Sequence, residues 1–115
     1  MKIEGPAKLV RIYVGEADQW HGQALATAIV ERARKEGLAG ATVTRGVEGF
    51  GAKSRIHTAS ILRLSEDLPV KVEIVDQAEN IARFLPLLDE MVGEGLITIQ
   101  DCEIVKYVHG PAPEK

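Results

Sequence analysis

The stretch VKVEIVDQAENIARFLPLLDEMV, from Val70 to Val92, changes its hydrophobic period halfway along. Its first part alternates between apolar and other residues, which is the period of a β-strand with one buried face, made here by Val70, Val72 and Ile74. Asp76 and Glu79 then have the spacing of a capping box, which predicts the start of a helix. The apolar residues that follow recur at helical spacing: Ile81, Ala82, Leu85, Leu88 and Val92. The stretch therefore predicts a strand that leads directly into an amphipathic helix.

Comparable patterns lie on both sides of this unit. The run KLVRIYV at residues 8–14 is rich in β-branched and aromatic residues and predicts a strand, and ATVTRGV at 41–47 predicts another. Between them, Leu25, Ile29 and Ala33 mark a helix that ends at Gly37. LITIQDCEIVKYV at 96–108 predicts a last strand, whose alternation changes phase near Gln100 and Asp101 and so indicates a bulge there.

The predicted order of elements is strand, helix, strand, strand, helix, strand. This order predicts an α+β ferredoxin-like βαββαβ sandwich, with a four-stranded antiparallel sheet and two helices on one face. The first strand carries apolar residues on both faces, with Leu9 and Tyr13 opposite the face of Ile12. We expect a further copy of the chain to cover the free face, and a half-solvated sheet is the alternative.

Composition limits the classes of function. The 115 residues fit one domain, 1–115, with ordinary globular composition and a formal net charge of -3. The Lys and Arg residues form no stripe, which argues against nucleic acid as a partner. The sequence contains no apolar run long enough to predict membrane insertion, and its start does not have the pattern of a signal peptide, so we expect a cytoplasmic protein. Cys102 is the single cysteine and is expected to be a structural strand residue.

A glycine-rich segment follows the second predicted strand, within a loop expected at about residues 49–68. Gly49 and Gly51 permit positive φ and close backbone approach, so that N–H groups can face an anion. Lys53 and Arg55 add positive charge, and Ser54 adds a hydroxyl. The sequence therefore indicates an anion-binding site. The alternative is that the glycines only relieve a bulge or a turn.

Other candidate ligand-binding residues lie near this loop and in the turn after the first strand. His57, with Thr58 beside it, is a metal ligand, a proton-sensitive switch or, as the favoured reading, a hydrogen-bonding anchor of the loop. Trp20 could stack on a base or fill a subunit contact, although packing is the favoured role. His21, which follows it, could cap the start of the first helix or take part in ligand binding. No histidine pair has metal-ligand spacing, and we assign no metal residue, although His21 and His57 could converge across a subunit boundary.

Catalysis is not indicated. Glu16 and Asp18 lie two residues apart, but turn and cap roles suit them better than an acid–base pair. No set of nucleophile, base and orienting group is recognisable, so we do not expect an enzyme. The tail at about residues 110–115, GPAPEK, has the composition of a frayed end.

The chain resembles members of the PII-like superfamily, and within it domain-of-unknown-function family 190. The resemblance rests on four stretches, in this order: VRIYVGEADQWHGQAL, GATVTRGVEGFGAKSRIHT, LPVKVEIVD and FLPLLDEMVGEGLITIQDCEIVKY. It implies a ferredoxin-like homotrimer that binds adenine nucleotides in clefts between subunits and contacts target proteins through the long loop after strand two. By position it places Gly49, Gly51 and Lys53 near the nucleotide phosphates, and Lys106 near the terminal phosphate.

Two departures from the PII pattern accompany the resemblance. PII proteins continue the GFG motif with a basic residue and glutamine, whereas this chain has Ala52, Lys53 and Ser54. The glycine-rich phosphate loop before the last strand is reduced to GEG, residues 93–95. The expected function is a PII-like regulatory protein that senses a small anionic ligand. The alternatives are a CutA-like metal-binding or metal-tolerance protein, or a small enzyme of unknown reaction.

Overall fold

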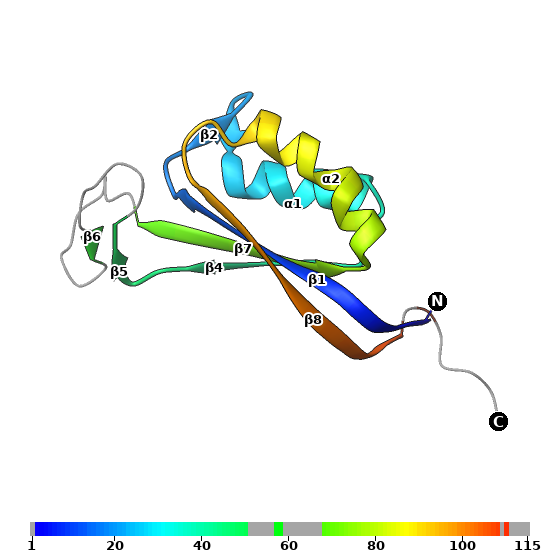
Figure 1. The fold of residues 1–115 in the computed structure, drawn as a ribbon. Coiled ribbons are helices and arrows are strands. Elements are labelled where there is room, and N and C mark those ends of the chain that lie inside the picture. Colours follow the sequence, from blue (N-terminus) through cyan, green and yellow to red (C-terminus); the bar gives the residue numbers. More distant parts are fainter. Residues whose placement is uncertain (1, 51–56, 59–67, 109, 111–115) are drawn as a thin grey trace.

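A four-stranded antiparallel sheet carries two helices on one face (Figure 1). The computed structural model describes residues 2–50, 57–58, 68–108 and 110, and only the backbone at 57–58. The sheet has the strand order β4-β7-β1-β8. Its elements are β1 (Lys2–Gly15), α1 (Leu25–Lys35), β4 (Ala41–Arg45), β7 (Pro69–Asp76), α2 (Ala78–Met91) and β8 (Leu96–Val108). The predicted ferredoxin-like fold is confirmed.

Two short ribbons extend from this body. β2 (Gln19–Trp20) pairs with β3 (Gln23–Ala24) in a hairpin between β1 and α1. β5 (Glu48–Gly49) pairs with β6 (His57–Thr58) beyond the end of β4. The second ribbon occupies part of the long segment for which the sequence predicted no regular element.

The core lies between the helices and the facing side of the sheet. Val10 and Ile12 of β1 and Val72 of β7 are fully buried there. The helices contribute their apolar stripes, which comprise Leu25, Ala28, Ile29, Ala33, Ile81, Phe84, Leu88 and Met91. Complete burial of one large apolar side chain stabilises a fold by about 1.5–3 kcal/mol. The two stripes therefore fix both helices on the same face of the sheet.

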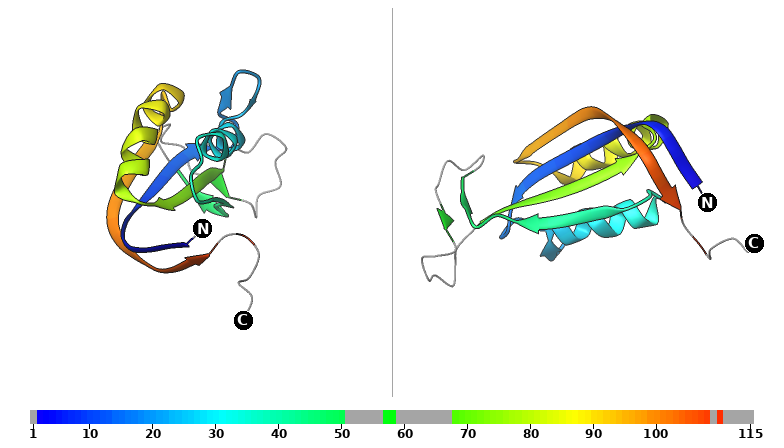
Figure 2. Two further views of the ribbon diagram at one scale, coloured as in Figure 1. Left: turned by 90° about the vertical axis from the view of Figure 1, so that its right-hand side faces the viewer. Right: turned by 90° about the horizontal axis from the view of Figure 1, so that it is seen from below.

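The ribbon formed by β1 and β8 changes its buried face along its length. Near the helices the buried residues of β1 have even numbers, such as Val10, whereas Ile3 and Ala7 are buried on the opposite face. Figure 2 shows this ribbon curving away from the helices, toward the start of β4. The hydroxyl of Tyr107 in β8 donates to the Ala39 carbonyl, at 2.8 Å. The curved ribbon thus covers part of the sheet face that the helices leave free.

The bulge predicted near Gln100 and Asp101 is wrong. Both residues keep regular register, opposite Leu9 and Lys8 of β1. The change in alternation arises because the two halves of β8 are covered on different faces. The register shift between the strands lies instead near the end of the ribbon, at Ile3 and Gly5 of β1.

The carboxylate of Asp76 joins three parts of the chain. Asp76 is 1% exposed. Its Oδ2 accepts a hydrogen bond from the Ala39 backbone N–H at 2.9 Å, and Oδ1 accepts from the Gln77 N–H at 2.6 Å and the Asn80 side-chain amide at 3.0 Å. The predicted capping box is therefore wrong. The N-cap of α2 is Gln77, which makes no side-chain cap bond, and Asp76 lies one residue before it.

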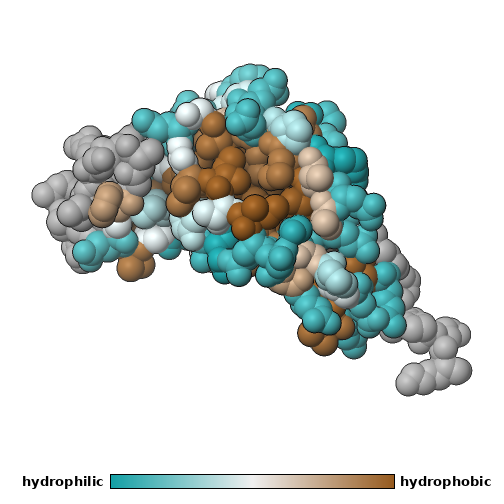
Figure 3. Space-filling model, viewed as in Figure 1, coloured by the Kyte–Doolittle hydropathy of each residue, from teal (hydrophilic) through white to brown (hydrophobic). Residues whose placement is uncertain are grey.

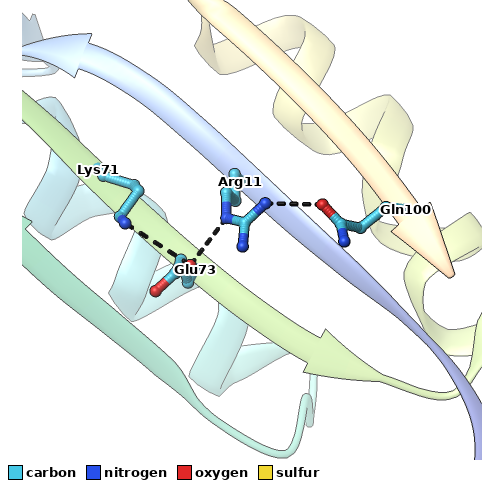
Figure 4. A network of polar contacts seen from close by, with 4 residues as sticks. All are labelled: Arg11, Lys71, Glu73 and Gln100. Atoms are coloured by element: carbon cyan, nitrogen blue, oxygen red, sulfur yellow. Dashed lines mark hydrogen bonds and ion pairs between the residues drawn. The ribbon is translucent and has the colours of Figure 1, made fainter. Parts of the chain in front are cut away.

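A polar network crosses the sheet face opposite the helices (Figure 4). Arg11 Nε lies 2.9 Å from Glu73 Oε2, and Arg11 Nη1 donates to Gln100 Oε1 at 2.7 Å. The hydrogen bond from Arg11 holds the pKa of the Glu73 carboxyl below its ordinary value of 4.5, partial burial opposes this shift, and the charge of Lys71 lowers the pKa further. This face is therefore more polar than Leu9 and Tyr13 alone suggested.

Exposed apolar residues lie along the edge strand β8. Figure 3 shows apolar side chains gathered on the face seen in Figure 1, where β8 runs past the helix layer. Leu96 is 54% exposed and Ile99 is 48% exposed. Edge strands with apolar side chains are surfaces on which other chains can pair.

We predict that Asp76→Ala lowers the free energy of unfolding by about 2–4 kcal/mol, because it removes the acceptor of three hydrogen bonds in a buried place. Urea denaturation followed by circular dichroism measures this difference. Asp89→Ala, at an exposed position of α2, is the matched control and should change stability by less than about 0.5 kcal/mol. Equal stability of the two variants would contradict the role given to Asp76.

Candidate functional site

The candidate site lies at the end of the sheet from which the β5–β6 ribbon extends. The end of β1, the end of β4 and the start of β7 meet here, since Gly15 pairs with Pro69 and Arg45 with Val70. Two backbone hydrogen bonds fix the connections: the Gly46 N–H donates to the Pro69 carbonyl at 2.7 Å, and the Glu16 N–H donates to the Leu68 carbonyl at 2.8 Å. We call this region, residues 15–16, 45–49 and 68–69, the mouth.

Arg45 and Glu16 form an ion pair at the mouth. Arg45 Nε lies 2.7 Å from Glu16 Oε2, and Arg45 Nη2 donates to Glu16 Oε1 at 3.1 Å, so the pairing is bidentate. Both side chains are exposed enough to exchange this contact for a bound anion. Arg45 is a site residue that was not predicted from the sequence, although its place directly before the glycine-rich segment was a usable signal.

Asp18 has the turn role that the sequence predicted. Its Oδ2 accepts a hydrogen bond from the Gly15 backbone N–H at 2.9 Å. The Leu25 N–H at the start of α1 donates to the Asp18 carbonyl at 2.8 Å. Asp18 therefore joins the end of β1 to the first turn of the helix.

Close packing against Pro69 accounts for two glycines of the mouth. A Cβ at Gly46 would lie 3.0 Å from Pro69 Cγ, and one at Gly49 would lie 3.1 Å from the same atom. Gly49 pairs with His57, and Glu48 with Thr58, so the backbone at 57–58 lies beside the candidate glycine. The geometric role of Gly49 is compatible with close approach of a ligand to the backbone.

The remaining residues of the glycine-rich candidate set are Gly51, Lys53, Ser54 and Arg55, which lie outside the described residues. The same holds for most of the loop expected at 49–68 and for most of the expected tail at 110–115. Their proposed contact with an anion remains a prediction from the sequence.

Trp20 and His21 lie in the hairpin on the helix side of the sheet (Figure 1). Their rings stack, with centroids 4.3 Å apart and an angle of 15° between the planes. Trp20 is partly buried and packs against the core, which confirms the packing role. His21 has a positive φ of 48°, which the tight turn requires. Ligand binding by Trp20 or His21 remains a prediction from the sequence.

Lys106 is exposed near the far end of β8. This part of β8 pairs with the first residues of β1, whereas the mouth lies at the last residues of β1. Within one chain, Lys106 is therefore separated from Gly49 by the length of the sheet. A shared site would require a second copy of the chain.

Within the ranges that the structure describes, no three His, Cys, Asp or Glu side chains are grouped so that they could hold a metal ion. No helix in these ranges is long and apolar enough to span a membrane. Cys102 is a partly buried free thiol in β8.

Gly95, in the reduced GEG loop, lies close to the backbone of β1. A Cβ on Gly95 would lie 2.7 Å from the Tyr13 carbonyl oxygen and 3.1 Å from Val92 Cγ1. By contrast, a Cβ on Gly93 would meet no atom within 4 Å. Gly95 is therefore required for the approach of the α2–β8 connection to the mouth end of β1.

Comparisons with known proteins give relatives along most of the chain. A UPF0166 protein of Methanocaldococcus jannaschii is 42% identical over 101 residues, covering 87% of this chain and 93% of the relative. A UPF0166 protein of Aquifex aeolicus is 40% identical over 100 residues, covering 85% and 92%. Both matches therefore span most of this chain and most of each relative.

Solved structures share the fold at low sequence identity. A Thermus thermophilus protein classed with PII-like signaling proteins has a TM-score of 0.63 and 21% identity, and the match covers 89% of this chain and 92% of that one. CPII of Thiomonas intermedia K12, bound to ADP and bicarbonate, has a TM-score of 0.55 and 19% identity, with coverage of 86% and 88%. CutA of Synechococcus elongatus PCC7942 has a TM-score of 0.56 and 11% identity, with coverage of 93% and 85%.

The sheet order, the two helices and these likenesses show that the chain has the same fold as these solved structures. The family model for DUF190, described as an uncharacterized ACR, matches residues 7–104. The chain belongs to this family, as the resemblance in its sequence indicated.

We predict that Gly95→Ala lowers the free energy of unfolding by about 1–3 kcal/mol, because its Cβ would overlap the Tyr13 carbonyl oxygen. Gly93→Ala adds the same methyl group to the same loop without a close contact and should retain parental stability. Thermal unfolding of the two variants side by side measures the difference. If Gly93→Ala were the more damaging change, the described approach of Gly95 to β1 would be wrong.

Proposed function

We propose that this protein is a PII-like regulatory protein without catalytic activity, which senses a small anionic ligand at the mouth and contacts a partner protein through the loop after β4. The observation that carries the proposal is the placement of Arg45, Gly46 and Gly49 at one end of the sheet, where the ends of β1 and β4 meet the start of β7. Lys53, Ser54 and Arg55 follow in the sequence and supply further donors for an anion.

The chemistry of the mouth favours a phosphate-bearing ligand. The Arg45 guanidinium presents a planar pair of donors to Glu16, and this geometry also suits phosphate oxygens. If a ligand anion replaced Glu16 as the partner of Arg45, the ion pair between the ends of β1 and β4 would break when the ligand binds. The mouth could thus couple ligand binding to the start of the loop.

An adenine nucleotide is the first ligand to test. CPII, which shares the fold, has been solved with ADP and bicarbonate bound. The nucleotide and the small anion are therefore screened separately.

We expect ADP, AMP or ATP to raise the melting temperature of the protein. A ligand at about one hundred times its dissociation constant adds roughly 2.7 kcal/mol per site, which corresponds to a shift of several degrees. Lys53→Ala should abolish this shift while leaving the melting temperature of the free protein nearly unchanged, because an isolated surface charge adds little stability. A thermal-shift screen that includes bicarbonate and inorganic phosphate makes the measurement.

Lys35→Ala, an exposed position on α1, is the matched control and should respond to nucleotide like the parent. Two results would contradict the proposed site: no shift with any nucleotide or anion, or an undiminished shift in Lys53→Ala. In either case the glycine-rich segment would serve backbone geometry alone.

We propose further that the chain forms a homotrimer. The exposed apolar residues Leu96 and Ile99 on the edge strand β8 support association. Light scattering after size-exclusion chromatography should give three times the chain mass across a range of concentrations. Ile99→Glu should shift the protein toward smaller species, whereas a monomeric parent at every concentration would disprove the trimer.

A further inference from the structure

A groove lies at the opposite end of β4 from the mouth. It has a volume of about 430 Å³, which falls within the range of small-molecule sites. Its walls come from α1, from the connection between α1 and β4, from the first residue of β4 and from Tyr107 of β8. The lining residues are Val30, Ala33, Arg34, Gly37, Leu38, Ala39, Gly40, Ala41 and Tyr107.

The walls of this groove are fixed in place. The backbone N–H of Ala39 is held by the buried Asp76 carboxylate, and its carbonyl accepts the Tyr107 hydroxyl. The Leu38 N–H donates to the Ala33 carbonyl at 3.0 Å, which closes the end of α1. The groove is therefore a preformed feature of the fold, held by hydrogen bonds on both sides of Ala39.

Arg34 is the unusual residue of the lining. In the described parts of the chain, every other arginine has a polar side-chain partner: Arg11 with Glu73, Arg32 with Glu36, Arg45 with Glu16 and Arg83 with Asn80. No such partner occupies the Arg34 guanidinium among these residues, and the neighbouring lining is largely apolar. A guanidinium beside apolar walls matches a ligand that joins one anionic group to an apolar body.

We infer that this groove binds a small organic acid with an apolar body, and that Arg34 pairs with its carboxylate. The apolar part lies against Val30, Ala33 and Leu38, next to the Tyr107 ring. Because the groove is at the start of β4 and the mouth is at its end, this site is separate from the proposed anion site. The inference does not depend on nucleotide binding.

The probe for this site is hexanoate, titrated into isotopically labelled protein and followed by amide chemical shifts. Binding in the millimolar range is expected for a probe of about eight non-hydrogen atoms. The shifts should concentrate at residues 34, 37–41 and 107. Hexanamide, which lacks the charge, and acetate, which lacks the apolar body, should each bind at least about fivefold more weakly than hexanoate.

Two pairs of variants locate the interaction. Arg34→Gln should weaken hexanoate binding about tenfold, whereas Lys35→Gln removes the same charge one residue away, outside the lining, and should leave binding unchanged. Gly40→Leu should block the groove without backbone strain, because a Cβ there meets no atom within 4 Å and Gly40 does not have a positive φ. Gly93→Leu, at an equally open position outside the lining, is its control.

The melting temperature of each variant should stay close to that of the parent, which confirms that the fold is retained. Equal binding of hexanoate and hexanamide would overturn the role of Arg34. Chemical-shift changes spread over the whole surface, or none at the groove up to about 10 mM hexanoate, would overturn the site. Loss of the nucleotide response through Lys53→Ala would not affect these results, so the two proposals can fail separately.

Discussion

The buried carboxylate of Asp76 fixes the relation between the two halves of the fold. A carboxylate that is withdrawn from water needs hydrogen-bond donors, and Asp76 takes them from Ala39, Gln77 and Asn80. These donors belong to the connection before β4 and to the beginning of α2. Asp76 itself ends β7, so one side chain sets the entry of β4 beside β7 and the position of α2 over the sheet. Tyr107 holds the opposite side of the Ala39 residue.

Local periodicity predicted most of the regular structure. The strand at Pro69–Asp76 and both helices follow patterns that one buried face imposes on a short segment. The early start of β1, at Lys2, was not predictable in this way, because Ile3 and Ala7 become buried only when the ribbon curves under the sheet. The same long-range packing changes the alternation in β8, and the local pattern alone suggested a bulge instead.

Some site residues could likewise be recognised from the local sequence, whereas the role of others depends on contacts between distant segments. The glycines around Gly49 and the neighbouring His57 are recognisable in the sequence, because these residue types are often found at binding sites. The pairing of Arg45 with Glu16 is not, since their proximity depends on the alignment of β4 with β1 through β7. Arg34 looks like any helix-surface arginine until the curved ribbon brings Tyr107 to the other side of the groove. Its significance arises from the contrast with the other arginines that the structure describes, each of which has a polar side-chain partner.

The central position of β1 has a consequence for how the domain is made. β1 lies between β7 and β8, so the first of these sheet strands to be synthesised pairs over residues 2–13 with the last one. Ile3 and Ala7 cannot reach their buried environment until β8 has been synthesised. Contacts between segments so distant in the chain form slowly, since the intervening loop must close first. During synthesis the nascent domain therefore has an incomplete sheet, with one side of β1 unpaired, and the final step of assembly is the addition of β8 at its edge.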